Sequence, residues 1–159
     1  MATETNFFNH IRSGNLEAVQ TALETHPDWI GITDERGSTP LLLATYYGHV
    51  PITQLLLKKG AEVNAIDGSG NTALMGVCFK GYEAIAELLI KAGAPINHAN
   101  NMGATALIYA VSFNKIGIAK LLLAHGADIY AQDAKGNSAL AHAKKQETTE
   151  MIELLEYHG

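Results

Sequence analysis

A period of 33 residues constrains the fold of this chain more than any single motif does. The segments 38–70, 71–103 and 104–136 align without a gap. Threonines, leucines and glycines recur at the same phase of each segment: Thr39, Thr72 and Thr105; Leu41, Leu74 and Leu107; Leu56, Leu89 and Leu122; Gly60, Gly93 and Gly126. Self-similarity at a period of this length is the signature of a repeat protein. We therefore predict a stack of similar units rather than one globular core.

Each unit carries the signals of two short helices and a turn. Thr39 can cap a first helix and Pro40 can open it, since a missing N–H is tolerated there. Gly48 separates this helix from a second, amphipathic one, which Gly60 can close in the left-handed conformation. The segment 67–70 fits a type I turn, with Asp first and Gly fourth. Because one such unit cannot bury its apolar face alone, we predict an all-α repeat solenoid of antiparallel helix pairs joined by β-hairpin-like turns.

The run 38–64 resembles the ankyrin repeat. It opens with Ser-Thr-Pro-Leu, passes through Tyr-Gly-His and ends with Leu-Leu-Leu-Lys-Lys-Gly-Ala-Glu-Val-Asn. Residues 71–97 and 104–128 follow the same pattern less strictly, so the resemblance covers nearly the whole chain. It implies an ankyrin-type stack and a binding role. It does not identify a partner, because this fold carries many different surfaces.

The two ends of the sequence have the character of capping repeats. Trp29 occupies an apolar position held later by Val63 and Ile96, and the last unit turns polar over residues 144–150. A polar outer face keeps a terminal repeat soluble. We expect a complete solenoid forming one domain, 1–159, made of an N-terminal capping repeat at 1–37, internal repeats at 38–70, 71–103 and 104–136, and a C-terminal capping repeat at 137–159.

The first helices depart from the family pattern at two positions. Ankyrin repeats usually have His two residues after the Pro. Four other residues stand there in this chain: Leu42, Met75, Ile108 and Ala141. We expect apolar packing to replace the polar network between repeats. Gly76 lies inside a first helix, where glycine costs about 1 kcal/mol relative to alanine, and we expect it to make room for the ring of Tyr109.

Composition argues against several classes of function. The net charge is −5 and no run of Lys and Arg exceeds two residues, so we expect no nucleic-acid binding. The N-terminus lacks the features of a signal peptide, and no apolar stretch approaches the roughly 20 residues that cross a bilayer. Cys78 is the single cysteine, which suits a reducing compartment. We expect a cytoplasmic protein that does not associate with membranes.

The sequence shows no constellation of residues for catalysis or metal binding. His125 and His158 occupy equivalent positions one repeat apart, too distant to share a tetrahedral metal site. Cys78 falls among core positions and is interpreted as a small packing residue rather than a nucleophile. We expect no enzymatic activity, no metal and no cofactor.

Aromatic side chains that the repeat pattern does not require precede the break between paired helices, which is Gly48, Gly81 and Asn114 in successive repeats. With one neighbouring lysine they are Tyr46, Tyr47, Phe79, Lys80 and Phe113. The turn tips contribute four further residues: Arg36, Ser69, Met102 and Lys135. Exposed aromatic and arginine side chains are typical of binding hot spots. We expect these nine residues to bind a protein partner in a concave groove, unless the rings pack against the adjacent turns and close it.

Three functions remain open from the sequence. The leading hypothesis is a monomeric adaptor or inhibitor that binds a protein partner in the groove. An alternative is a structural protein that self-associates through the same groove or an end cap. The other alternative is an accessory subunit of an enzyme or a binder of small ligands, which would need a closed pocket.

Overall fold

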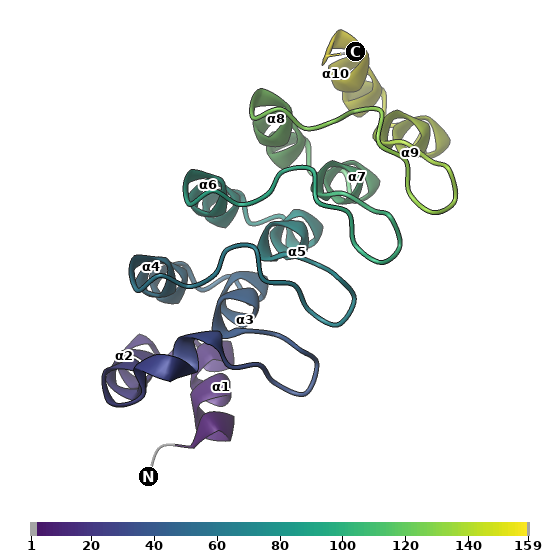
Figure 1. The fold of residues 1–159 in the computed structure, drawn as a ribbon. Coiled ribbons are helices and arrows are strands. Elements are labelled where there is room, and N and C mark those ends of the chain that lie inside the picture. Colours follow the sequence, from purple (N-terminus) through teal and green to yellow (C-terminus); the bar gives the residue numbers. More distant parts are fainter. Residues whose placement is uncertain (1–2, 159) are drawn as a thin grey trace.

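The computed structural model describes residues 3–158, which form ten α-helices and one short 3-10 helix, η1 (Pro27–Gly31). One row contains α1 (Glu4–Ser13), α3 (Pro40–Tyr46), α5 (Ala73–Lys80), α7 (Ala106–Ser112) and α9 (Ala139–Gln146). The other row contains α2 (Leu16–Thr25), α4 (Val50–Lys58), α6 (Glu83–Lys91), α8 (Ile116–Ala124) and α10 (Thr149–His158). The turns project beside the first row (Figure 1). The predicted all-α repeat solenoid is confirmed.

The first-row helices from α3 onward begin at the hydroxyl residues that the repeat predicted. The side-chain oxygens of Thr39, Thr72, Thr105 and Ser138 each accept a hydrogen bond from the backbone N–H three residues later, over 3.2–3.3 Å. These bonds satisfy amide groups that have no partner within the helix. The predicted glycine breaks are also present, since φ is +78° at Gly48 and +88° at Gly60.

The turns are linked to one another along the stack. Within the turn 67–70, the N–H of Gly70 donates to the carbonyl of Asp67 over 3.0 Å, which is the hydrogen bond of a β-turn. Isolated antiparallel bridges at the turn bases pair Ile66 with Thr72 and Gln132 with Ser138. Between turns, backbone hydrogen bonds join Gly68 to Arg36, Asn101 to Ser69 and Ala134 to Met102 over 2.9–3.2 Å. This ladder holds successive turn tips in fixed register.

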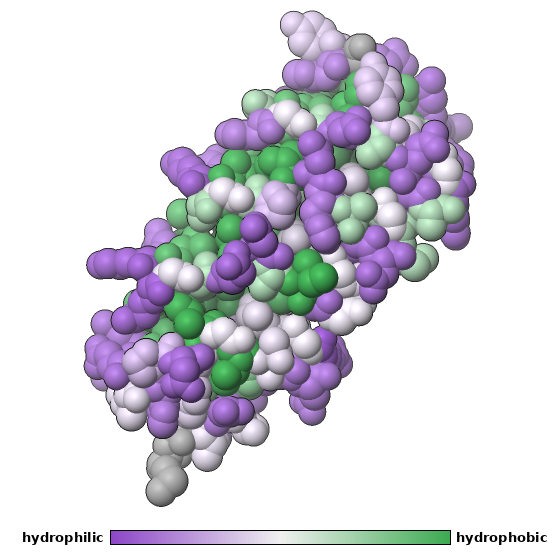
Figure 2. Space-filling model, in the orientation of Figure 1, coloured by the Kyte–Doolittle hydropathy of each residue, from purple (hydrophilic) through white to green (hydrophobic). Residues whose placement is uncertain are grey.

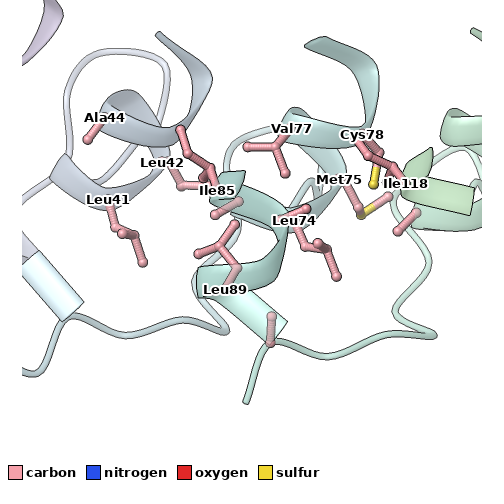
Figure 3. Packing of buried hydrophobic residues seen from close by; sticks show 14 of the residues in the cluster. Leu41, Leu42, Ala44, Leu74, Met75, Val77, Cys78, Ile85, Leu89 and Ile118 are labelled. Carbon is pink, nitrogen blue, oxygen red and sulfur yellow. The ribbon is translucent and has the colours of Figure 1, made fainter. Parts of the chain in front are cut away.

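The core runs continuously along the stack. Leu74 of α5 and Leu89 of α6 are fully buried, and each packs among apolar residues of its own and the neighbouring repeats (Figure 3). Burying one leucine side chain contributes about 1.5–3 kcal/mol. At the N-terminal end the repeat leucines give way to an aromatic cluster, in which the rings of Phe7 and Trp29 lie 5.4 Å apart and His26 stacks on Trp29 at 4.0 Å.

Apolar packing replaces the family histidine in three repeats, since Leu42, Met75 and Ile108 are buried, whereas Ala141 in the last repeat is only half-buried. Polar links between repeats lie instead near the turns and helix junctions. His49 Nε2 lies 2.8 Å from the carbonyl oxygen of Arg12, and His98 Nε2 lies 2.8 Å from that of Gly70. The repeats are therefore joined by hydrogen bonds at the edge of the apolar stack.

The expectation that Gly76 makes room for the ring of Tyr109 is wrong, because the ring beside Gly76 is that of Tyr46. A Cβ added to Gly76 would meet Cδ1 of Tyr46 at 3.6 Å and no atom of Tyr109 within 4 Å. Tyr109 turns instead toward the turn before its own helix, where its hydroxyl accepts a hydrogen bond from Nδ2 of Asn100 over 2.9 Å. The space beside Gly76 therefore remains open.

Candidate functional site

A hollow of about 770 Å³ lies between the turns and the helices α3, α5 and α7. We call it the groove. The apolar side chains of Leu42, Leu43 and Met75 line it, together with Gly76. Six of the nine predicted binding residues also line it: Arg36, Tyr46, Tyr47, Ser69, Phe79 and Phe113. Figure 2 shows hydrophobic residues between bands of hydrophilic ones along one face of the stack.

The four predicted aromatic residues form a connected row. Tyr46 and Tyr47 meet edge to face at 5.6 Å, and Phe79 and Phe113 do so at 4.7 Å. The rings of Tyr46 and Phe79 are parallel, with centroids 6.5 Å apart, so they connect the two pairs across the repeat boundary. Each of the four residues nevertheless keeps 40–45% of its surface exposed. The row is held by its own ring contacts and still offers apolar surface.

The other three predicted residues lie outside the lining of the groove. Lys80 sits beside it, with Nζ 5.0 Å from the ring centroid of Tyr46 and 6.0 Å from that of Tyr82, in cation–π geometry. Met102 and Lys135 are exposed at turn tips farther along the stack, Met102 with 62% of its surface accessible. The structure therefore gathers the aromatic residues and separates them from these two tips.

Asp67, Asn71 and Tyr109 also line the groove, and sequence reasoning did not select them. Oδ1 of Asp67 accepts hydrogen bonds from the backbone N–H groups of Ser69 and Asn71, over 2.9 and 3.0 Å. The 33-residue alignment could have drawn attention to Asp67. The first-helix residue nine positions after the turn Asp or Asn is Leu43, Gly76, Tyr109 and His142 in successive repeats, and only Gly76 has no side chain.

Cys78 and Asp133 have shifted pKa values, and neither residue lines the groove. Cys78 is fully buried, and burial raises the pKa of its thiol, so it behaves as a packing residue. Hydrogen bonds from the backbone lower the pKa of Asp133, at a turn that does not line the groove. Within residues 3–158, no three His, Cys, Asp or Glu side chains are grouped so that they could hold a metal ion. None of the helices described is long and apolar enough to span a membrane.

Comparison with known proteins matches the chain to family models along most of its length. A model of ankyrin repeats in three copies matches residues 7–100 and 65–133, and a model of ankyrin repeats in many copies matches residues 111–156. Ankyrin repeats are in general protein–protein interaction modules, and the family is generally non-enzymatic.

Two curated proteins illustrate the similarity. The chain is 37% identical over 62 residues to the mouse (Mus musculus) ankyrin repeat and SAM domain-containing protein 6, covering 39% of this chain and 7% of that protein. It is 41% identical over 73 residues to human (Homo sapiens) oxysterol-binding protein-related protein 1, covering 40% and 8%. The matched region spans less than a tenth of either relative. The family models, which together cover well over half of the sequence, show that this chain belongs to the ankyrin-repeat family.

Proposed function

We propose that the chain is an adaptor or inhibitor that binds one protein partner in the groove, with Tyr46, Tyr47, Phe79 and Phe113 as anchors and Lys80 beside them. The observation that carries the proposal is the connected row of four half-exposed rings along a concave surface. Rings already held by mutual contact lose little conformational freedom on binding, which reduces the entropic cost of association. On this proposal the protein acts as a monomer in the cytoplasm.

The amount of apolar surface in the row fits a role as the centre of an interface. A large aromatic side chain buries about 150–250 Å² when fully enclosed. With 40–45% still accessible on four residues, a partner could cover roughly 300 Å² more. A standard interface contributes about 800 Å² from each side. The row would then supply over a third of that area, and the turn tips Arg36 and Ser69 could extend it at the rim.

The proposal is tested by affinity capture with wild type and with the variant Tyr46→Ala/Phe79→Ala/Phe113→Ala, followed by measurement of Kd for any purified partner. Tyr157→Ala is the matched control, since Tyr157 is 86% exposed on α10, away from the groove. The groove variant should lose the partner while the control keeps it. If all three proteins recover the same set, the assignment to the groove is wrong. Sedimentation of the same proteins distinguishes partner binding from self-association, which would appear as a groove-dependent dimer.

A further inference from the structure

The turn residue that opens each hydrogen-bonded turn has a side-chain partner in three of four cases. Oδ2 of Asp34 pairs with Nη2 of Arg12 at 3.1 Å, and Oδ2 of Asp133 pairs with Nε2 of His142 at 2.8 Å. Nδ2 of Asn100 donates to Tyr109 and to Asn71 at 2.9 and 2.8 Å. Within residues 3–158, no side chain donates to Oδ2 of the fourth, Asp67. Among these four turn residues, Asp67 is therefore the one whose carboxylate has an oxygen without a side-chain donor in the described part of the chain.

Gly76 explains why Asp67 has no such partner. Tyr109 and His142 reach the turn residue nine positions earlier in their own repeats, and the position equivalent to theirs in this repeat is Gly76. The missing side chain leaves space that opens into the groove, because Asp67 and Gly76 both line it. Tyr46, Phe79 and Tyr109 line the same hollow. An acceptor oxygen and aromatic walls therefore meet in one recess, which we call the Gly76 recess.

The charged residues that line the groove leave one net negative charge. Arg12 and Asp34 line it but neutralise each other. Glu35 and Asp67 then oppose the single cation Arg36, which makes no ion pair within 4.0 Å among the residues described. Lys80 lies outside the lining, over the ring of Tyr46. A cationic group from outside is favoured electrostatically at Asp67, although Arg36 and Lys80 weaken that attraction.

We propose that the Gly76 recess binds an arginine side chain of the partner. The guanidinium donates to Oδ2 of Asp67 and stacks on the ring of Tyr46 or Phe79. This inference rests on the proposed function, because it describes the partner that the groove accepts. Arginine fits better than lysine because its planar group can bind a carboxylate and stack on an aromatic face at the same time. An ammonium group would remain more strongly hydrated.

Two substitutions remove the recess in ways that neighbouring repeats already tolerate. Asp67→Asn removes the charge but keeps the oxygen that holds the turn, as Asn100 does in the next repeat. Gly76→Tyr supplies the side chain that Tyr109 has at the equivalent position. Its hydroxyl would donate a hydrogen bond to Oδ2 of Asp67 and so take the place of the arginine. Glu35→Gln is the matched control, since it removes one negative charge from the groove outside the recess. Thermal unfolding of each variant verifies that it folds.

The experiment is a titration of the ¹⁵N-labelled protein with N-acetyl-arginine amide, followed by amide chemical shifts. We expect millimolar binding with shifts centred on residues 67–76, weakened at least about fivefold by Asp67→Asn and by Gly76→Tyr but little changed by Glu35→Gln. N-acetyl-citrulline amide, which is planar but uncharged, should bind at least fivefold more weakly. Absence of binding, equal binding by citrulline, or unchanged binding by Asp67→Asn would overturn the proposal. Equal or tighter binding of N-acetyl-lysine amide would overturn the assignment to arginine.

The titration contains no partner protein, so its failure is separable from failure of the proposed function. If the arginine amide fails while the aromatic variant still loses a partner, the groove binds protein by other chemistry. If the amide binds as expected but no capture depends on the rings, the recess stands and the adaptor or inhibitor role does not.

Discussion

The imidazole of His142, in helix α9, donates from Nε2 over 2.8 Å to Oδ2 of Asp133, the turn residue nine positions earlier. An ionised carboxylate can only accept, so the proton of this bond is on Nε2. The pKa of Asp133 is lowered chiefly by the backbone N–H of Asn137, with further hydrogen bonds from His142 and Lys135 acting against partial desolvation. The ionised form of Asp133 therefore favours the folded state.

The first prediction concerns the dependence of stability on pH. Because the folded-state pKa of Asp133 lies below the unfolded value of about 3.9, its contribution is present above that value. It is lost as pH falls through the folded-state pKa. Urea unfolding should show wild type more stable than Asp133→Asn at pH 7 and 5, with the difference shrinking below about pH 4. A difference that stays constant down to pH 2.5 would contradict this account.

The second prediction concerns two left-handed residues that are not glycine. Asn114 and Glu147 end α7 and α9 with φ of +54° and +56°, where earlier repeats have Gly48 and Gly81. A left-handed backbone costs a residue with a Cβ about 1–2 kcal/mol. Glu147→Gly should raise the free energy of unfolding by about 1 kcal/mol, and Asn114→Gly by less, since asparagine tolerates this conformation better.

The control for these substitutions is Lys144→Gly, in the exposed last turn of α9. Its backbone is helical, so glycine should lower the free energy of unfolding by about 1 kcal/mol. Chemical denaturation of the three variants gives opposite signs for the left-handed and helical positions. Destabilisation by Glu147→Gly would mean that the side chain of Glu147 contributes more than its backbone conformation costs.

The third prediction separates strain from crowding at the turns. Gly103 and Gly136 both have positive φ, +72° and +80°. A Cβ on Gly103 would lie 2.9 Å from the backbone nitrogen of Ala134 in the next turn, whereas a Cβ on Gly136 would meet nothing within 4 Å. Gly103→Ala should therefore lower the free energy of unfolding by more than Gly136→Ala, which carries only the backbone term of about 1 kcal/mol. Equal losses would show that the next turn shifts freely.

The sequence predicts the repeat architecture well because its determinants are local. The caps at Thr39 and Thr72, the break at Gly48 and the turn 67–70 depend on residues within a few positions of one another. The 33-residue period then predicts which units stack. Such features can be predicted without knowledge of tertiary contacts, and the structure has them at the positions that the pattern predicts.

The candidate site is predictable only in part. The period identified the half-exposed ring positions of Tyr46 and Phe79, since both fall on the same phase. It could not show how the rings turn, because ring direction depends on contacts across repeats. This is why the sequence indicates Tyr109 as the ring beside Gly76, whereas the structure has Tyr46 there. The free oxygen of Asp67, by contrast, could be anticipated from the alignment, because Gly76 stands where Tyr109 and His142 stand in the later repeats.

The last prediction uses two helical glycines that differ in their surroundings. Gly76 lies inside α5, where a Cβ would meet only Cδ1 of Tyr46, at the ordinary contact distance of 3.6 Å. Gly76→Ala should therefore raise the free energy of unfolding by about 1 kcal/mol through helix propensity. In α8 a Cβ on Gly117 would collide with the carboxylate of Glu83, so Gly117→Ala must displace that side chain and should gain less.

Urea denaturation of both alanine variants, together with the double variant Gly117→Ala/Glu83→Ala, measures the effect of that collision. Removing the Glu83 carboxylate should restore the increase in the free energy of unfolding that Gly117→Ala gives. The same Glu83→Ala change should leave the increase that Gly76→Ala gives unaltered. A loss of stability on Gly76→Ala would mean that its position cannot accept even one methyl group, so the space beside it would be too small for an arginine side chain. Stabilisation by Gly76→Ala is therefore a structural condition for the Gly76 recess, independent of any ligand.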